Sequence, residues 1–198
     1  ARFRGQEILE TFDTLVDPCC PIPELSTSIH HITQDMVAGK PMIQEVLPQL
    51  LEFIGDSIIV GHGIPFDIEL VANAAAASGI ATPIGSSRFI DTLRMARLYG
   101  GSKENSLAKL CNHFNIEIAG AHRALNDVLV NVSVFYYLSQ NFKTTEQIFE
   151  ALSRPIEMKA MPLGKHKGRP FKEIPVDYLR WAAHQNFDED LLYSLRSE

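Results

Sequence analysis

The alternation of apolar and polar positions divides the start of the chain into short elements. Residues 2–18, RFRGQEILETFDTLVDP, predict the end of one strand, a turn at Gly5 and a second strand, because β-branched and apolar residues lie on both sides of the glycine. Apolar side chains recur at helical spacing over residues 41–55 and predict a helix that ends at Gly55. The apolar run SIIVGH, residues 57–62, is typical of a strand that is covered on both faces.

The middle of the chain continues with one further strand pattern and four helical patterns. The first helical stretch is rich in alanine and can end at Gly79. The strand covers residues 88–92, and the helices cover residues 66–79, 92–100, 105–114 and the stretch after residue 122. Asp91 and Asn105 stand just ahead of two of these helices and are expected to cap them. This order of elements predicts an α/β fold, a mixed sheet flanked by helices.

Near residue 139 this pattern ends, and a short amphipathic helix leads to a separate compact tail. We therefore expect a first domain over residues 1–139, a linker helix over residues 140–158 and a small basic C-terminal module over residues 159–198.

Two features of the tail have plain structural interpretations. Tyr178, Leu179 and Trp181 have helical spacing and are expected to form the core of the module, with Trp181 as a platform for a nucleobase as the alternative. The acidic run at residues 188–190 is expected to be a solvated loop.

The composition is that of a globular protein. The 198 residues and 22.1 kDa suit one ordinary domain with a small appendage. Apolar runs are shorter than a membrane span and the chain does not open with a signal peptide, so no membrane partner is expected. The adjacent Cys19 and Cys20 and the isolated Cys111 fit neither a disulfide framework nor a zinc site, which favours a reducing, cytoplasmic location.

The net charge of −6 argues against a protein that coats nucleic acid, but the charge is uneven. Residues 155–175 hold five basic side chains against two acidic ones. Lys165, Lys167 and Arg169 lie there in GKHKGRP, whose glycines leave backbone N–H groups open to phosphates. The alternatives for this segment are a solvated loop and a contact with nucleic acid.

His122 stands five residues ahead of Asp127, where a helix begins. Residues five apart on a helix point about 140° apart, so these side chains converge only if His122 lies in the loop before the helix. Asp67 likewise follows an apolar strand at the start of a helix, and α/β sheets build their sites at such positions. Taken alone, each residue also has an ordinary explanation as a helix cap or a loop residue.

Five blocks occur in order along the chain: IHHITQDMVAGKPMIQEV, GHGIPFDIELV, RFIDTLRMAR, NSLAKLCNHFNI and AHRALNDV. In sequence and spacing they resemble the DEDDh 3′→5′ exonucleases, which include the proofreading subunit of bacterial DNA polymerase III and the exonuclease X-like enzymes. The tail MPLGKHKGRPFKEIPVDYLRWA is similar to a C-terminal module of exonuclease X-like proteins. The resemblance covers essentially the whole chain and implies a ribonuclease H-like fold.

By that resemblance, Asp67 and Asp127 match metal-binding carboxylates and His122 matches the general base. His30 matches the histidine beside the 3′-terminal nucleotide. Phe66, next to Asp67, is either a core residue or a residue that stacks on a base.

Two positions depart from the pattern of the family without touching a metal ligand. His31 stands where a glycine is usual, and Gly63 replaces the asparagine that is common after His62. Fine contacts with the substrate are the features that these departures affect.

The cofactors that the resemblance implies are two Mg²⁺ or Mn²⁺ ions. Two such ions about 3.5–4 Å apart clamp the attacking and leaving oxygens of a phosphodiester displacement. These hard cations require oxygen ligands, which explains the carboxylates. Imidazole, with an unperturbed pKa of about 6.5, can take a proton from the attacking water near neutral pH.

The first motif of the family, a D-x-E pair on the first strand, does not occur in that context here. Residues 67–69 read D-x-E, but they lie in a predicted helix, where residues two apart do not share a face. Asp67 and Asp127 supply two negative charges against four positive charges on two divalent cations. We therefore expect the first motif to precede the printed sequence, with a degenerate homologue as the alternative.

These observations together predict a metal-dependent 3′→5′ exonuclease that releases nucleoside 5′-monophosphates from DNA 3′ ends, single- or double-stranded. We expect Lys165, Lys167 and Arg169 to be substrate contacts, together with His30 and Phe66. The alternatives are a non-catalytic nucleic-acid-binding or polymerase-associated module of the same fold, and an exoribonuclease that acts on RNA. A polymerase partner and a homodimer remain open.

Overall fold

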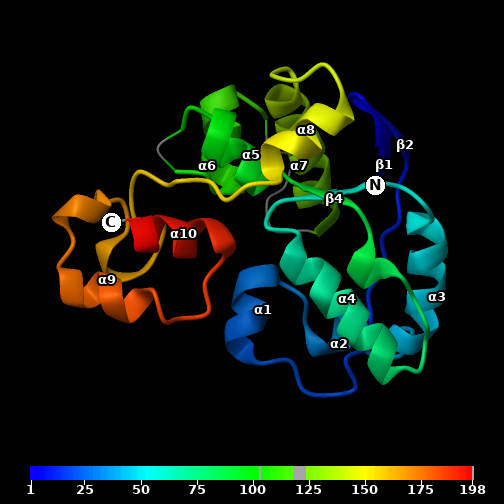
Figure 1. Cartoon of the computed structure of the whole chain (residues 1–198). Helices are drawn as coiled ribbons and strands as arrows, with labels where there is room; N and C mark the ends of the chain where they lie inside the picture. The colour runs from blue at the N-terminus through cyan, green and yellow to red at the C-terminus, as the bar shows by residue number, and fades with distance from the viewer. Residues whose placement is uncertain (103, 118–123, 198) are drawn as a thin grey trace.

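The computed structural model describes residues 1–102, 104–117 and 124–197 (Figure 1). The chain starts with a hairpin in which β1 (Arg2–Arg4) pairs antiparallel with β2 (Glu7–Glu10). Gly5, in the turn, has a φ of 61°, a conformation that glycine adopts without steric cost. The predicted hairpin is confirmed, with a second strand shorter than the apolar pattern suggested.

Helices follow the hairpin. Pro23 directly precedes α1 (Glu24–His30), and α2 (Gln34–Val37) comes next. The sequence pattern did not predict these two short helices. The predicted helix up to Gly55 is confirmed as α3 (Ile43–Ile54).

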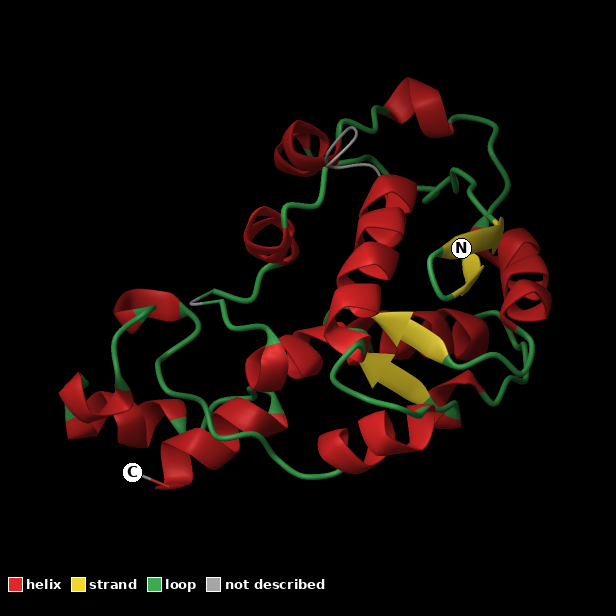
Figure 2. Cartoon of the chain, turned by 90° about the horizontal axis from the view of Figure 1, so that it is seen from above, coloured by secondary structure: helices red, strands yellow, loops and turns green. Residues whose placement is uncertain are grey.

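The central strands are β3 (Ile59–Gly61) and β4 (Phe89–Asp91), which pair in parallel. The described strands form two separate pairs, β1–β2 and β3–β4, and not one continuous sheet. Helices lie on both sides of the two parallel arrows (Figure 2). Within β3, Gly61 is buried and Ile59 and Val60 are half-buried, whereas Ile58, just before the strand, is 39% exposed.

The part of the chain up to residue 152 is called the larger part here. Its remaining helices match the predicted stretches. They are α4 (Pro65–Ala77), α5 (Thr92–Tyr99), α6 (Leu107–Phe114), α7 (Ala124–Ser139) and α8 (Thr145–Leu152), with a short 3-10 turn, η1 (Ile84–Ser86), before β4. Ser106, and not the expected Asn105, is the N-cap residue of α6. No helix in the described part of the chain is long and apolar enough to cross a membrane.

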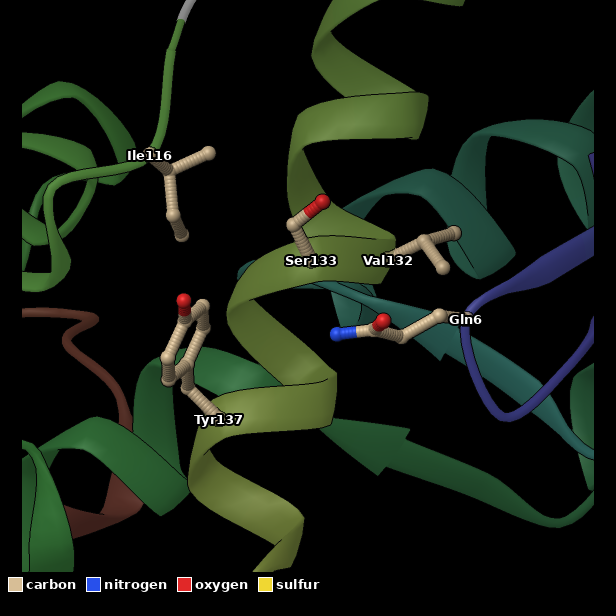
Figure 3. A pocket seen from close by; sticks show the side chains of 5 residues that line it. All are labelled: Gln6, Ile116, Val132, Ser133 and Tyr137. Atoms are coloured by element: carbon tan, nitrogen blue, oxygen red, sulfur yellow. The ribbon is translucent and has the colours of Figure 1, made fainter.

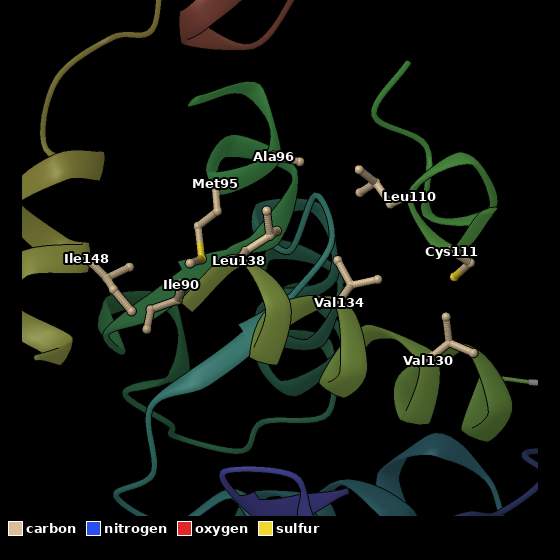
Figure 4. Close-up of a cluster of buried hydrophobic side chains, with 9 residues drawn as sticks. All are labelled: Ile90, Met95, Ala96, Leu110, Cys111, Val130, Val134, Leu138 and Ile148. Atoms are coloured by element: carbon tan, nitrogen blue, oxygen red, sulfur yellow. The ribbon is translucent and has the colours of Figure 1, made fainter. Parts of the chain in front are cut away.

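A continuous hydrophobic core joins β4 to four of these helices (Figure 4). Its buried members come from β4, α5, α6, α7 and α8: Ile90, Met95, Ala96, Leu110, Cys111, Val130, Val134, Leu138 and Ile148. Cys111 therefore packs as a small apolar residue, whereas Cys19 and Cys20 are exposed, and all three are free thiols. The long helix α7 contributes three residues, so its position relative to β4 is fixed by packing.

The C-terminal part has a small core of its own. Two 3-10 turns, η2 (Gly164–His166) and η3 (Phe171–Glu173), precede α9 (Val176–Ala182) and α10 (Glu189–Ser197). The buried members of this second core are Met161, Phe171, Ile174, Ala182, Leu191 and Leu195. Trp181 lies outside this cluster and is 54% exposed, so the expectation that it forms the core was wrong.

Asp190, expected in a solvated loop, is in fact 1% exposed. Arg94 contacts both of its carboxylate oxygens, at 3.2 and 3.1 Å from Nε, and Arg97 donates to Oδ2 at 2.6 Å. The backbone N–H of Ile156 donates to Oδ1 at 3.0 Å. Because both arginines lie on α5, this buried carboxylate joins α10 to the larger part of the chain.

Arginine is well suited to this junction because its planar guanidinium satisfies several acceptors at once. Arg94 also donates to the carbonyl oxygens of Leu152 and Arg154, at 2.7 and 2.8 Å. Arg97 forms a second, two-pronged contact with Asp188 at 2.8 and 3.0 Å. These arginines hold the pKa of the Asp190 carboxyl below its ordinary value despite the opposing effect of burial.

We predict that Asp190→Asn lowers the free energy of unfolding by about 3 kcal/mol, because it removes the charge that pairs with Arg94 and one of the two carboxylates that pair with the buried Arg97. Asp177→Asn is the matched control, since Asp177 pairs with Arg180 on an exposed surface of the same module. Chemical denaturation of both variants measures the effect. Equal stability of Asp190→Asn and Asp177→Asn contradicts the prediction.

Candidate functional site

The candidate carboxylate Asp67 is exposed and lies in the first turn of α4, directly after the β3 strand. Ile64 is the N-cap residue of α4, and no side chain caps the helix, so Asp67 does not act as a cap. Pro65 occupies the first helical position, where its missing N–H costs no hydrogen bond. The carboxylate therefore does not occupy the N-cap position, and it accepts a hydrogen bond from its own backbone N–H.

The loop between β3 and α4 is held by a buried carboxylate. Gly63 has a φ of 72°, which favours glycine, and its N–H donates to Asp91 Oδ1 at 2.8 Å. The same oxygen accepts from Leu93 N at 2.9 Å and so caps α5. Asp91 was predicted as a cap, and this is confirmed. Its second task, to fix the loop that leads to Asp67, was not predicted.

Thr92, completely buried, joins three segments through one hydroxyl. Its Oγ1 lies 2.7 Å from Asn131 Oδ1, 3.1 Å from the Gly61 carbonyl oxygen and 3.1 Å from His62 Nδ1. The hydroxyl has one proton and two lone pairs, so it donates to only one of these groups, and the direction of its contact with His62 depends on which ring nitrogen carries the proton. The end of β3, the start of α5 and the middle of α7 are thereby tied together.

This link relates the two candidate carboxylates. Asp127 lies in the first turn of α7, and Asn131 is four residues later. Residues four apart share a helix face, so Asp127 stands one turn beyond Asn131 on the face that meets Gly61 and Thr92. Asp67 follows the same strand end by six residues. Both carboxylates are exposed and belong to segments that converge at the carboxyl end of the β3–β4 pair.

The pKa values of Asp67 and His62, near this end of the strands, shift in opposite directions. Desolvation raises the pKa of Asp67, and the nearby Asp91 adds to this effect. Burial lowers the pKa of His62, although Asp91 acts in the opposite direction. Burial therefore favours the neutral form of the His62 ring. A cation beside Asp67 would favour the charged carboxylate, which the protein alone disfavours.

Two of the predicted contacts of the terminal nucleotide lie on α1 and α4. His30 ends α1 and accepts a hydrogen bond from Ile32 N at its Nδ1, at 3.0 Å, so the proton of the neutral ring is on Nε2. His31, in the position where the family pattern has glycine, has a φ of 59°. Phe66 is 70% exposed, which excludes the interpretation as a core residue.

The basic candidates lie far along the chain, in the loop around η2. Lys165, Lys167 and Arg169 are all exposed. Lys167 lies 3.4 Å from Glu104 of the larger part, and Arg169 lies 3.3 Å from His166 Nδ1. These residues are separate from the α4–α7 end of the parallel strands, and the structure does not join them to Asp67 or Asp127 by any described contact.

The general-base candidate, His122, lies outside the described residues. Within the described ranges, no group of three or more histidine, cysteine, aspartate or glutamate side chains gathers in a way that could hold a metal ion. A shallow pocket of about 290 Å³ lies along the later turns of α7, lined by Gln6, Ile116, Val132, Ser133 and Tyr137 (Figure 3). None of the candidate side chains lines this pocket.

Comparison with known protein families gives two matches. The family model RNase_T, described as "Exonuclease", matches residues 1–135. A second model, described as "Putative quorum-sensing-regulated virulence factor", matches residues 150–195.

Individual relatives agree with the first match. The chain is 37% identical over 139 residues to the DNA polymerase III subunit epsilon of Aquifex aeolicus, covering 68% of this chain and 66% of that protein. It is 30% identical over 171 residues to the PolC-type DNA polymerase III of Clostridium perfringens, covering 82% of this chain and 12% of that protein. The chain therefore spans only a part of these relatives.

A solved structure is similar as well. Exonuclease X in complex with 5′ overhanging duplex DNA superimposes with a TM-score of 0.58 at 25% sequence identity. The superposition covers 76% of this chain and 86% of that one.

We predict that Asp91→Ala lowers the free energy of unfolding by about 2 kcal/mol, because it removes the α5 cap and leaves the N–H of Gly63 without its acceptor. Asp91→Asn retains an Oδ1 acceptor and should keep most of the stability. Thermal and chemical unfolding of both variants test this. If the alanine and asparagine variants lose equal stability, the charge of Asp91 and not its hydrogen bonds is the stabilising feature.

Proposed function

Because the chain belongs to the RNase_T exonuclease family, with the DEDDh-like motifs and the ribonuclease H-like α/β fold of that group, we propose that it hydrolyses DNA from the 3′ end and releases nucleoside 5′-monophosphates. Family membership gives the nuclease class, and the direction and the mechanism are the proposal. The exonuclease domain of this proposal covers residues 1–139, residues 140–158 form a linker helix, and residues 159–198 form an accessory module.

The observation that carries the proposal is the link through Thr92. One buried hydroxyl lies within hydrogen-bonding distance of both the Gly61 carbonyl, six residues before Asp67, and Asn131, which shares a helix face with Asp127. Two exposed carboxylates are thus held near one end of the parallel strand pair by a rigid, buried network. A nuclease needs such rigidity because displaced ligands cost rate steeply.

Divalent Mg²⁺ or Mn²⁺ fits the chemistry of this pair, and two such ions would activate water and stabilise the leaving oxygen. Asp67 and Asp127 offer the oxygen ligands that these cations prefer. A cation beside Asp67 would offset the desolvation that raises the pKa of this carboxyl. Two carboxylates leave four positive charges half neutralised, so the complete site requires acidic ligands in addition to these two.

His122 is the proposed general base. It stands five residues ahead of Asp127 in the sequence, and its task would be to accept the proton of the attacking water.

His30 and Phe66 are the proposed contacts of the terminal nucleotide. The Nε2–H of His30 is available to donate to a sugar or phosphate oxygen, because Nδ1 is engaged with Ile32. Phe66 exposes its ring beside Asp67 and offers a face for a base.

DNA is the proposed substrate because the similar Exonuclease X structure contains duplex DNA with a 5′ overhang, and because two relatives are DNA polymerase III proteins. The same relatives support a polymerase as a partner. A substrate RNA, and a non-catalytic binding module on the same fold, are the alternative functions that the following experiments separate.

We predict that the protein with Mg²⁺ or Mn²⁺ degrades 5′-labelled DNA stepwise from its 3′ end, and that His122→Ala lowers the rate by about 10² to 10⁴-fold, the usual contribution of a general base. His113→Ala is the matched control, because His113 is an exposed histidine on α6. Denaturing electrophoresis of the products measures both.

Three results of this assay contradict the proposal. Near-normal turnover by His122→Ala refutes the base assignment. DNA binding without turnover by the unmodified protein supports the binding-module alternative. Faster hydrolysis of a matched RNA oligonucleotide identifies an exoribonuclease.

We further predict that Asp67→Asn weakens Mn²⁺ binding by at least about tenfold, since it removes a charged oxygen ligand from a hard cation. Glu69→Gln is the control, because Glu69 is an exposed carboxylate two residues further along the same helix and on a different face. Isothermal titration calorimetry measures the affinity independently of turnover. Equal weakening by both substitutions would indicate a general charge effect in place of a ligand.

A further inference from the structure

The exposed indole of Trp181 is the feature of the C-terminal module that its core does not explain. Tyr178 and Leu179, one turn or less before it on α9, pack against the core of the module. Trp181 is absent from that cluster, and more than half of its surface is open to solvent. A large aromatic side chain at such a position contributes little to stability and is available for contact with a ligand.

Two aromatic contacts link the ring of Trp181 to a basic loop. Its centroid lies 5.3 Å from that of Tyr178, and the Tyr178 ring lies 4.5 Å from the ring of His166 in the loop. An added Cβ at Gly164 would lie 3.1 Å from the Tyr178 hydroxyl, so a side chain there would crowd the tyrosine. Gly164 and Gly168, with φ of 71° and 81°, bound the segment that carries the lysines.

The loop of residues 164–169 carries a local positive charge. Lys165 and Arg169 are exposed, and after burial they are the causes that lower the pKa of His166. Lys167 lies 3.4 Å from Glu104 in an exposed pair, which contributes little and can be exchanged for another anion. A phosphate that approached the loop would therefore meet two cations without an anionic partner among the described residues and a third in a weak pair.

We infer that Trp181 and the basic loop of residues 164–169 form a binding surface for single-stranded nucleic acid. The indole stacks on an unpaired base, and Lys165 and Arg169 contact the phosphates on either side. This inference rests on the proposed function for the class of its ligand, a nucleic acid. An exposed aromatic face favours a single strand over a duplex, whose bases stack on one another and present only their edges.

The surface is held to the exonuclease domain by contacts that the ligand does not need. Asp190 of α10 binds Arg94 and Arg97 on α5, the helix that Asp91 caps. A strand on the module is thus bound at a fixed distance from the α4–α7 end of the parallel strands. The surface would retain a substrate strand while the proposed site acts on an end.

Trp181 is the single tryptophan of the sequence, so its fluorescence reports this surface alone. We would titrate the full chain with a dT oligonucleotide of about 15 nucleotides, a length comparable with known single-strand sites, in the presence of a chelator that prevents hydrolysis. Stacking should quench the emission. Fluorescence anisotropy of a labelled oligonucleotide should show that Trp181→Ala weakens binding about tenfold and that Trp181→Phe retains most of it.

A second pair of variants tests the charges. Lys165→Gln combined with Arg169→Gln should weaken binding and lower the dependence of log affinity on log salt by about 1.4, since each lost phosphate contact on a single strand contributes about 0.7. Lys40→Gln and Tyr193→Ala are the controls, because Lys40 is an exposed lysine far along the chain and Tyr193 an exposed aromatic residue on α10.

The outcomes separate this inference from the proposed function. Unchanged emission at saturation, or equal binding by Trp181→Ala and Tyr193→Ala, overturns the inference. Equal quenching by duplex DNA or by polyglutamate overturns the assignment to a single strand. Quenching by dT in a protein without exonuclease activity leaves the surface standing and refutes the proposed function alone.

Discussion

The start of helix α5 is the constraint on which the arrangement of this protein depends. Asp91 accepts from Gly63 and Leu93, and the neighbouring Thr92 connects Gly61 with Asn131. These groups are buried, where an unmade hydrogen bond is costly, so the three segments must keep their relative positions. The hydrophobic core next to them fixes α5 and α7, and the polar network sets the register between these helices and the end of β3.

The same helix organises the C-terminal module with a different interaction. Arg94 and Arg97, on α5, hold the buried Asp190 of α10. A buried ion pair gives little net stability compared with apolar packing, but it is highly directional and leaves a large penalty if one partner is lost. One helix of eight residues therefore links the end of the parallel strands with the accessory module. If the proposed function on DNA holds, the start of α5 supports the site and its later residues hold the C-terminal module.

The side chains that carry the proposed chemistry are exposed, whereas those that position them are buried. Asp67, Phe66 and Trp181 reach solvent, and Asp91, Thr92 and Asn131 do not. This division is physically reasonable, because ligands must be accessible and their supports must be rigid. The support was the harder part to foresee: Asp91 was recognisable as a helix cap, but no spacing in the sequence connects it with Gly63 or connects Thr92 with Asn131.

The sequence by itself determined the local elements, since helical and strand periodicity and the positions of glycine depend on neighbours along the chain. The hairpin, α3, α4, α5, α7 and α8 agree with the pattern, and the motifs identify the family. Short-range patterns do not encode contacts between distant segments, and here the predictions failed. Burial of Asp190 and exposure of Trp181 depend on partners that are far away along the chain. Only the tertiary structure decided them, because the free energy of a charged or aromatic side chain depends on what surrounds it.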